Sequence, residues 1–248
     1  MVKLDKHYVD PRLVVLYDIE NPRGEDTDFY LNFANKINAK QIVDLGCGTG
    51  ILTRELALSG REVIGVDPAS AMLAVAQQHP DADRVQWING DASVLGNRQA
   101  DLVLMTGNVA QVFLEIDDWL TTLTNIFNSL CPGGYLAFES RNPLVKAWQQ
   151  WNRDESYYEF DSPHGRMASW VAVVDVHDNR VQLEGHNLFL ETGEVIVAES
   201  ELVFRSREEI AAQLTQIGFT VERVYGDWHQ TTFDDTEPLM VFIACRPL

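Results

Sequence analysis

The chain has 248 residues, of which 46% are hydrophobic and 23% are charged. This balance is typical of a soluble globular protein and argues against wholesale disorder and against a fibrous repeat. The 37 acidic residues outnumber the 19 basic residues, so that the formal net charge is −18. Because nucleic acids and anionic membranes are bound largely through Lys and Arg, we expect neither as a partner.

The lack of targeting signals and the spacing of the cysteines predict a cytoplasmic protein. No run of about 18 apolar residues occurs, so no membrane-spanning helix is expected. The first residues, MVKLDKHYVDPR, lack the apolar stretch of a signal peptide, and none is expected. Cys47, Cys131 and Cys245 are odd in number and widely spaced, which fits neither a disulfide framework nor a zinc site. We therefore expect a reducing compartment and no metal.

In chain order, a polar lead-in comes first and ends in a helix that carries Phe29, Leu31, Phe33 and Ile37. Short apolar runs then alternate with helical patterns. The expected strands are residues 41–46, 62–67, 85–90, 100–107 and 134–140, and the expected helices are residues 51–59, 69–79 and 117–130. Continuous Val, Ile and Leu runs that alternate with helices predict a parallel sheet covered on both faces.

The chain changes character after about residue 142. Three long strand-like runs, separated by short turns, predict an antiparallel β insertion and occupy residues 166–176, 180–190 and 194–204. Ser206 and Glu209 then form the capping-box pattern of a helix over residues 207–217. Gly218 ends that helix, and two strands follow at residues 219–225 and 239–246.

The strongest chemical signal is VDLGCGTG, residues 43–50. Its glycines allow a sharp turn from a strand into a helix and a close approach of a ligand to the backbone. Asp67 ends the next strand, where a carboxylate can accept hydrogen bonds from two ribose hydroxyls. Asp91 follows the third strand, where an acidic turn can bind an adenine amino group. The carboxyl ends of adjacent parallel strands meet at one edge, so these groups predict a nucleoside-like ligand.

This succession of motifs resembles the class I S-adenosylmethionine-dependent methyltransferases. The resemblance covers about residues 40–141 and is carried by VDLGCGTG, GVDPASAML, GDA and LCPGG, while the terminal helix and strands are similar to the end of that fold. It implies an α/β, Rossmann-like, doubly wound sheet of seven strands whose last strand is antiparallel, with the antiparallel β insertion added. It also implies S-adenosyl-L-methionine as the cofactor.

The resemblance further implies a role for each motif. Asp44 is expected at the methionine ammonium group, Asp67 at the ribose and Asp91 at the adenine edge. The expected cofactor-binding residues are Asp44, Gly46, Cys47, Gly48, Gly50, Asp67, Pro68, Met72, Asp91, Ala92, Thr106 and Gly107. The chain is then divided into a lead-in (1–38), a cofactor-binding core (39–141), the β insertion as a lid or dimer contact (142–205) and a C-terminal helix with two strands (206–248).

Several of these residues also have purely structural interpretations. Asp67 and Asp91 can act as helix N-caps, and Met72 can belong to the core. Asp44 can accept hydrogen bonds from the loop, and Cys47 can be a small buried hydrophobe. These alternatives remain open at the level of the sequence.

The methyl acceptor is expected at the sheet edge above the cofactor. In-line transfer from a sulfonium requires mainly positioning, so no catalytic residue is assigned. The candidates for acceptor binding are Tyr17, Tyr30, Asn108, Glu139 and Arg141, with Gln111, His186, Trp228 and His229 as further candidates. Glu139 and Arg141 can equally form an ion pair. An aromatic group can provide packing, a pocket or a dimer contact, and comprises Trp148, Trp151, Tyr157, Tyr158, Phe160 and Trp170.

Two other functions remain as alternatives. A non-catalytic S-adenosylmethionine-binding protein would carry the same binding residues. An NAD-dependent oxidoreductase is disfavoured, because the turn reads Gly46-x-Gly48-x-Gly50 rather than G-x-G-x-x-G and no Tyr-x-x-x-Lys pair appears. The motifs of DNA methylases are absent after the fourth strand. A small-molecule acceptor is therefore expected, with a protein substrate as the next alternative. The protein is expected to be a monomer or a homodimer.

Overall fold

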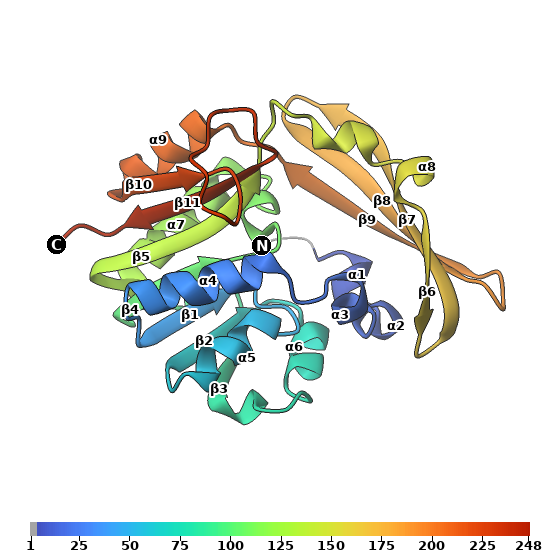
Figure 1. The fold of residues 1–248 in the computed structure, drawn as a ribbon, viewed down its shortest axis with the longest axis horizontal. Helices are drawn as coiled ribbons and strands as arrows, with labels where there is room; N and C mark the ends of the chain where they lie inside the picture. The colour runs from blue at the N-terminus through green and yellow to red at the C-terminus, as the bar shows by residue number, and fades with distance from the viewer. Residues whose placement is uncertain (1–3) are drawn as a thin grey trace.

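The apolar runs of the sequence form the centre of a seven-stranded sheet in the computed structural model, which describes residues 4–248 (Figure 1). The strand order is β10-β11-β5-β4-β1-β2-β3. The strands are β1 (Gln41–Leu45), β2 (Glu62–Asp67), β3 (Val85–Asn89), β4 (Ala100–Met105), β5 (Leu130–Arg141), β10 (Thr220–Tyr225) and β11 (Leu239–Cys245). Strands β1 to β5 run parallel, and β11 lies antiparallel between β5 and β10. The predicted sheet and its antiparallel last strand are therefore confirmed.

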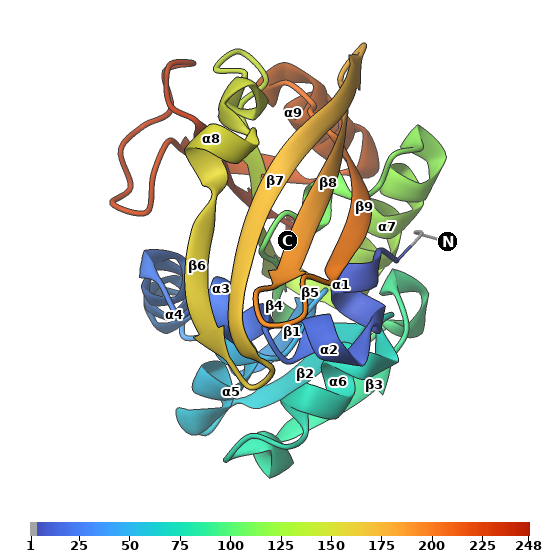
Figure 2. The same ribbon diagram turned by 90° about the vertical axis from the view of Figure 1, so that its right-hand side faces the viewer.

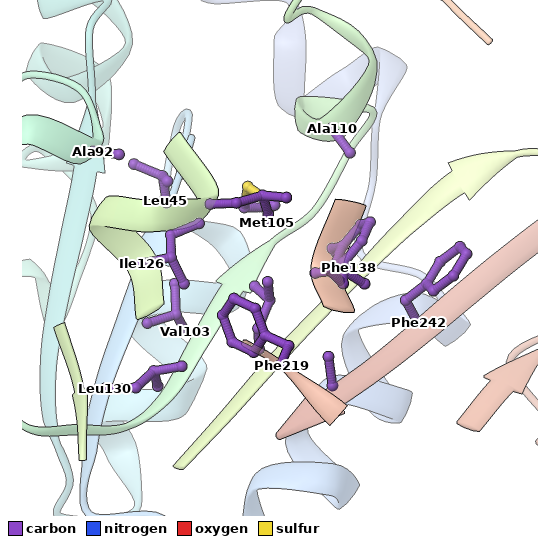
Figure 3. Packing of buried hydrophobic residues seen from close by; sticks show 14 of the residues in the cluster. Leu45, Ala92, Val103, Met105, Ala110, Ile126, Leu130, Phe138, Phe219 and Phe242 are labelled. Carbon is purple, nitrogen blue, oxygen red and sulfur yellow. The ribbon is translucent and has the colours of Figure 1, made fainter. Parts of the chain in front are cut away.

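Helices cover both faces of this sheet, as continuous apolar strands require. On β1, Ile42 belongs to the apolar layer beneath α4 (Glu25–Lys36) and α5 (Ile51–Leu58). Val43 belongs to the opposite layer, beneath α7 (Ile116–Ser129) and α9 (Arg207–Ile217). Figure 3 shows part of the second layer, in which Phe138 of β5 stacks on Phe242 of β11 with ring centroids 5.2 Å apart. The main helices are α4 (Glu25–Lys36), α5 (Ile51–Leu58), α6 (Ser70–Ala76), α7 (Ile116–Ser129) and α9 (Arg207–Ile217).

The capping box predicted for α9 is present. Ser206 Oγ accepts a hydrogen bond from the Glu209 amide at 3.2 Å, and Glu209 Oε2 accepts one from the Ser206 amide at 2.7 Å. Gly218 ends the helix with φ of +116°, a conformation that glycine adopts without the clash of a Cβ. None of the helices in the described chain is long and apolar enough to cross a bilayer.

The β insertion forms a second, four-stranded antiparallel sheet in the order β6-β7-β8-β9 (Figure 2). Its strands are β6 (Tyr158–Ser162), β7 (Gly165–His177), β8 (Arg180–Phe189) and β9 (Val195–Val203), preceded by η4 (Ala147–Gln150) and α8 (Arg153–Ser156). The three long runs match β7 to β9. Strand β6 was not predicted, because its short sequence, YEFDS, mixes polar and aromatic residues without a continuous apolar run.

The lead-in folds into three short helices before α4, namely α1 (Lys6–Val9), α2 (Pro11–Val14) and α3 (Tyr17–Glu20). We call residues 5–20 the N-terminal cap. Leu13 and Leu16 pack beneath the four-stranded sheet, and Val14 packs against Met72 of α6. An added Cβ at Gly185 of β8 would lie 2.3 Å from the ring of His7, so this cap fits closely against the sheet. The cap therefore bridges the two sheets beside the carboxyl edge of the larger one (Figure 1).

Candidate functional site

The predicted binding residues converge on one edge of the seven-stranded sheet. Asp44 is in register with Gly65, and Asp67 is in register with Asn89, so the ends of β1, β2 and β3 lie side by side. Because all three strands run parallel with β4, the loops that follow them open at the same edge. The glycine turn, Asp67, Asp91 and Gly107 therefore surround one region.

The glycine turn depends on backbone conformations that other residues adopt poorly. Gly46, Gly48 and Gly50 have φ of +77°, +54° and +75°. A Cβ at Gly46 would lie 2.3 Å from a methyl group of Val109, and one at Gly50 would lie 2.4 Å from the indole of Trp87. These two glycines are therefore required by packing within the fold.

Gly48 has a different environment from the other two glycines. The nearest atom to an added Cβ would be Met72 Cε at 3.3 Å, followed by Tyr17 Cε1 at 3.8 Å. Both neighbours are ends of side chains beneath or within the N-terminal cap. The Gly48 amide donates a hydrogen bond to Asp67 Oδ2 at 2.8 Å, which ties the turn to the end of β2. Gly48 thus has more room for a Cβ than Gly46 or Gly50, and only the movable ends of two side chains cover it.

Asp67 holds the backbone of the site. Besides the bond from the Gly48 amide to Oδ2, its Oδ1 accepts a hydrogen bond from the Ala69 amide at 2.8 Å. Asp67 is 8% exposed. Burial raises the pKa of Asp67, while the N–H groups of Ala69 and Gly48 oppose that rise. Asp67 is not the N-cap of α6, a position held by Ala69. Each carboxylate oxygen keeps a further lone pair that can accept a hydrogen bond from a ligand hydroxyl.

Asp44 carries an unsatisfied buried oxygen. Its Oδ2 accepts a hydrogen bond from Thr53 Oγ1 at 2.6 Å, whereas Oδ1 has no hydrogen-bond partner among the described residues. The residue is 1% exposed, and burial raises its pKa to about 6. A buried polar atom without a partner is rare in folded proteins, and a bound ammonium group would satisfy this one. The residues present therefore fit the amino-acid end of S-adenosylmethionine.

The other predicted cofactor residues lie around this centre with different exposures. Asp91 is exposed and caps η2 (Ala92–Val94), accepting a hydrogen bond from the Ser93 amide at 2.9 Å. A hydrogen bond from the Ser93 side chain and, secondarily, that of the amide lower the pKa of Asp91. Ala92 is buried, Pro68 is exposed and Thr106 is half-buried. The N-cap interpretation of Asp91 is thus observed.

Met72 and the thiol of Cys47 are both buried in the fold. Met72 is 1% exposed and packs among apolar residues of the N-terminal cap, while its Cε approaches the glycine turn. Burial raises the pKa of the Cys47 thiol well above its usual value. The thiol therefore stays protonated at neutral pH and is a poor nucleophile.

Tyr17 lies across the site. Its ring edge approaches Gly48, and its hydroxyl would lie 3.8 Å from a Cβ added at Gly107. Burial and, secondarily, the charge of Asp67 raise the pKa of Tyr17 to about 12. The hydroxyl is therefore protonated at neutral pH and can donate a hydrogen bond. Tyr17 links the glycine turn to the loop that follows β4.

Glu139 organises that loop from the end of β5. It is 7% exposed and accepts hydrogen bonds from the Gly107 amide at 2.5 Å, from the Asn108 amide at 3.4 Å and from the Tyr30 hydroxyl. Burial raises the pKa of Glu139 to about 7. Tyr30 is fully buried, so it contacts Glu139 rather than the open part of the site. Glu139 therefore positions the backbone of Gly107 and Asn108 next to Tyr17.

Arg141 does not form an ion pair with Glu139. Its Nε donates a hydrogen bond to Asn108 Oδ1 at 3.1 Å, and its amide donates one to Gln111 Oε1 at 3.3 Å. Its guanidinium lies over the Trp151 ring at 5.2 Å from the centroid. The ion-pair interpretation of these two strand-end residues is thus not observed.

The aromatic group predicted after β5 separates into packing contacts. Trp148 and Trp151 contact Phe204, with ring centroids 4.6 and 6.1 Å away. His186 stacks on Trp170 at 4.8 Å. Because the neighbouring positions on β8 contact His7 and side chains alternate along a strand, His186 faces away from the N-terminal cap.

The last loop places its aromatic residue against α4. Trp228 packs on Phe29 and Tyr30, with ring centroids 5.7 and 5.8 Å away. It therefore supports the buried Tyr30 rather than the glycine turn. Across residues 4–248, no three His, Cys, Asp or Glu side chains gather in a way that could hold a metal ion.

Two site residues were missed by the sequence reasoning. Thr53 binds Asp44, and Asp18 of the cap accepts a hydrogen bond from the Thr49 hydroxyl and lies 3.1 Å from His79. Thr53 follows the glycine turn by one helical turn, which is a local signal that could have been used. Asp18 gave no such signal, because its partners lie 31 and 61 positions away along the chain.

The raised pKa of Glu139 makes the stability of the protein depend on pH. From about pH 5 to about pH 8 the folded state retains this proton longer than the unfolded state, so stability falls as pH rises. We expect the free energy of unfolding of the wild type to fall by about 2–3 kcal/mol more over this range than that of Glu139→Gln. Urea denaturation at both pH values measures the difference. Parallel pH dependences for the two proteins would contradict the burial effect.

Comparisons with known proteins agree with this architecture. Residues 42–134 match a family model described as a methyltransferase domain. The biotin biosynthesis bifunctional protein BioHC of Cellvibrio japonicus is 31% identical over 142 residues, covering 56% of this chain and 27% of that protein. The ubiquinone biosynthesis O-methyltransferase of Aliivibrio fischeri is 24% identical over 123 residues, covering 49% of this chain and 52% of that protein. This chain thus spans about half or less of the length of these two relatives.

A solved structure extends the likeness to the whole fold. The CcbJ methyltransferase from Streptomyces caelestis superposes with a TM-score of 0.76 over 97% of this chain and 99% of that chain, at 19% identity. The likeness therefore includes the β insertion and the N-terminal helices as well as the seven-stranded sheet. At this identity the likeness establishes the fold.

Proposed function

We propose that this chain, which belongs to the class I S-adenosylmethionine-dependent methyltransferases, transfers a methyl group from S-adenosyl-L-methionine to a small-molecule acceptor. The observation that carries the proposal is the unpartnered Oδ1 of buried Asp44, directly before the glycine turn. An ammonium group bound there would give this oxygen the partner it lacks. The adjacent Asp67 and Asp91 would then accept hydrogen bonds from the ribose and the adenine.

The bound cofactor supplies an electrophilic methyl group on its sulfonium. The residues of this chain bind the cofactor, orient the acceptor and enclose both. Glu139 fixes the Gly107 and Asn108 amides, and Tyr17 closes the space between Gly107 and Gly48. Exclusion of water and alignment of the acceptor lone pair provide the rate enhancement in this reaction class. The Tyr17 hydroxyl, protonated at neutral pH, orients the acceptor by donating a hydrogen bond.

A small acceptor is supported by the charge and by the relatives. With a net charge of −18, the surface repels nucleic acid. The names of the two relatives refer to the biosynthesis of biotin and of ubiquinone, both small molecules. In this proposal the β insertion, residues 142–205, and the N-terminal cap enclose the acceptor as a lid. The free thiols of all three cysteines are consistent with a cytoplasmic location.

A thermal-shift comparison of S-adenosylhomocysteine and NAD tests the cofactor assignment. At about 100 times its Kd, S-adenosylhomocysteine should stabilise the protein by about 2.7 kcal/mol, which raises Tm by about 5–10 °C. NAD should leave Tm unchanged. The matched variant Asp44→Asn retains the shape of the side chain and should lose most of the shift. A shift with NAD alone would refute the proposal.

Turnover separates an enzyme from a non-catalytic binder. A panel of small metabolites is incubated with the protein and S-adenosyl-L-methionine, and release of S-adenosylhomocysteine is measured. Release that depends on one class of acceptor identifies an enzyme. Binding of the cofactor without release on any member of a broad panel would favour the non-catalytic alternative.

A further inference from the structure

In the described part of the chain, Arg141 is a partly buried arginine that forms no ion pair, although the charge of Glu139, two positions earlier on β5, acts on it. Its guanidinium makes one side-chain hydrogen bond, from Nε to the neutral oxygen of Asn108. Within residues 4–248, neither of its two terminal nitrogens has a hydrogen-bond partner. Arg205 offers a contrast, because its terminal nitrogens donate to the carbonyl oxygens of Ala110 and Phe113. Arg205 is therefore satisfied by the fold, whereas Arg141 keeps donors free.

The free donors of Arg141 are held in a fixed direction. Asn108 accepts from Nε, Trp151 lies against the guanidinium plane, and Gln111 accepts from the backbone amide. Gln111 is itself fully buried and donates to the Val203 carbonyl at 3.3 Å. A guanidinium fixed in this way loses little conformational entropy when it binds a planar or tetrahedral anion.

Arg141 stands at the acceptor end of the site. It lies two residues beyond Glu139 at the end of β5, and its partner Asn108 directly follows Gly107. Tyr17 approaches the same Gly107 from the cap. Asp44 lies on β1, Asp67 ends β2 and Asp91 follows β3, so three carboxylates disfavour an anion in that part of the site. The one carboxylate that acts on Arg141, that of Glu139, is occupied by the Gly107 amide and the Tyr30 hydroxyl. The free positive charge is therefore placed where the acceptor, and not the cofactor, would bind.

We propose that Arg141 binds an anionic group of the methyl acceptor, a carboxylate or a phosphate, and thereby positions its nucleophile for transfer. The inference rests on the proposed function and specifies the substrate class of that site. Two parallel N–H donors match two oxygens of either anion. An uncharged analogue leaves the desolvated guanidinium unpaired, so the acceptor is selected by charge as well as by shape.

The tryptophan beneath Arg141 provides a direct readout. We would label the protein with 5-fluorotryptophan, assign the Trp151 resonance with Trp151→Phe, and titrate acetate and methyl phosphate at constant ionic strength. The titrations use the free protein and its complex with S-adenosylhomocysteine. The Trp151 resonance should shift saturably in both forms, and the ratio of the two apparent Kd values distinguishes a carboxylate site from a phosphate site.

Three variants give this titration its controls. Arg141→Gln should weaken anion binding by about tenfold or more, because a charge-assisted hydrogen-bond pair is lost. Arg141→Lys keeps the positive charge but lacks the two parallel N–H donors, and it should bind the anion with intermediate affinity. Arg153→Gln removes an exposed arginine that also lies over aromatic rings, those of Tyr157 and Trp170, and should behave as the wild type.

The outcomes separate this inference from the proposed function. An unmoved Trp151 resonance with both anions, or an equal response in Arg141→Gln, would overturn the anion site. A normal anion response without S-adenosylhomocysteine binding would refute the proposed function alone. Once an acceptor is known, Arg141→Gln should raise its KM with a smaller effect on kcat, and Arg141→Lys should restore part of the KM. A fall in kcat with an unchanged KM would overturn the role of Arg141 in binding the acceptor.

Discussion

Replacing Gly48 with alanine is expected to weaken the binding of S-adenosylhomocysteine by about 5- to 150-fold. The added Cβ would stand 3.3 Å from Met72 Cε and 3.8 Å from the Tyr17 ring. In the proposed complex the cofactor lies against this turn, so the added methyl group would also crowd the ligand. Such overpacking typically costs about 1–3 kcal/mol, which corresponds to that range of affinity. Isothermal titration calorimetry measures the change.

Gly60→Ala is the matched control for this experiment. Gly60 has φ of +74°, close to the +54° of Gly48, and an added Cβ there meets no described atom within 4 Å. Both variants should lose about 1–2 kcal/mol of stability through the left-handed backbone. Only Gly48→Ala should lose cofactor affinity. Equal affinities for the two variants would show that the turn does not contact the ligand.

Asp67→Ala should affect both folding and binding. Removal of the carboxylate leaves the amides of Gly48 and Ala69 without their acceptor, at a cost of about 2–4 kcal/mol in the free energy of unfolding. The loss of the proposed ribose contact should weaken S-adenosylhomocysteine by a further 1–3 kcal/mol, roughly 5- to 150-fold. Urea denaturation and calorimetry measure the two effects separately.

The isosteric variant Asp67→Asn distinguishes the two roles. Its single amide oxygen can accept from one of the two amides, so about half of the stability loss should remain. Affinity should stay low, because the amide group lacks the charge that strengthens hydrogen bonds from ribose hydroxyls. If Asp67→Asn binds S-adenosylhomocysteine as the wild type does, Asp67 supports the backbone without contacting the ligand.

Patterns within short stretches of sequence specified the larger sheet. The apolar runs of β1 and β4 alternate between two core layers, and only a sheet with both faces covered buries both sets. Gly46 and Gly50 are required because their positive φ and their contacts with Val109 and Trp87 exclude a Cβ. The apolar alternation and the positive φ of glycine are local properties that the sequence signals, whereas the contacts with Val109 and Trp87 appear only in the tertiary structure.

The assignment of side chains to the site was less complete. Tyr30 and Glu139 were both selected as acceptor candidates, yet the structure shows that they bond to each other across 109 positions of sequence. The N-terminal cap was interpreted as a polar lead-in, although Leu13 and Leu16 are almost fully buried. Helices of four residues are too short to produce a clear apolar period, so neither the cap nor its contacts could be predicted.

The sequence by itself determined the parallel sheet, the sharp glycine turn and the carboxylates at three strand ends, because strand periodicity and backbone freedom are local properties. Only the tertiary structure decided that Asp44 keeps an unpartnered oxygen, that Tyr17 spans Gly48 and Gly107, and that Arg141 is held by Asn108 and Trp151 with free donors. These features join segments far apart in the chain. Their charges and contacts depend on burial, which arises only when the separate elements pack together.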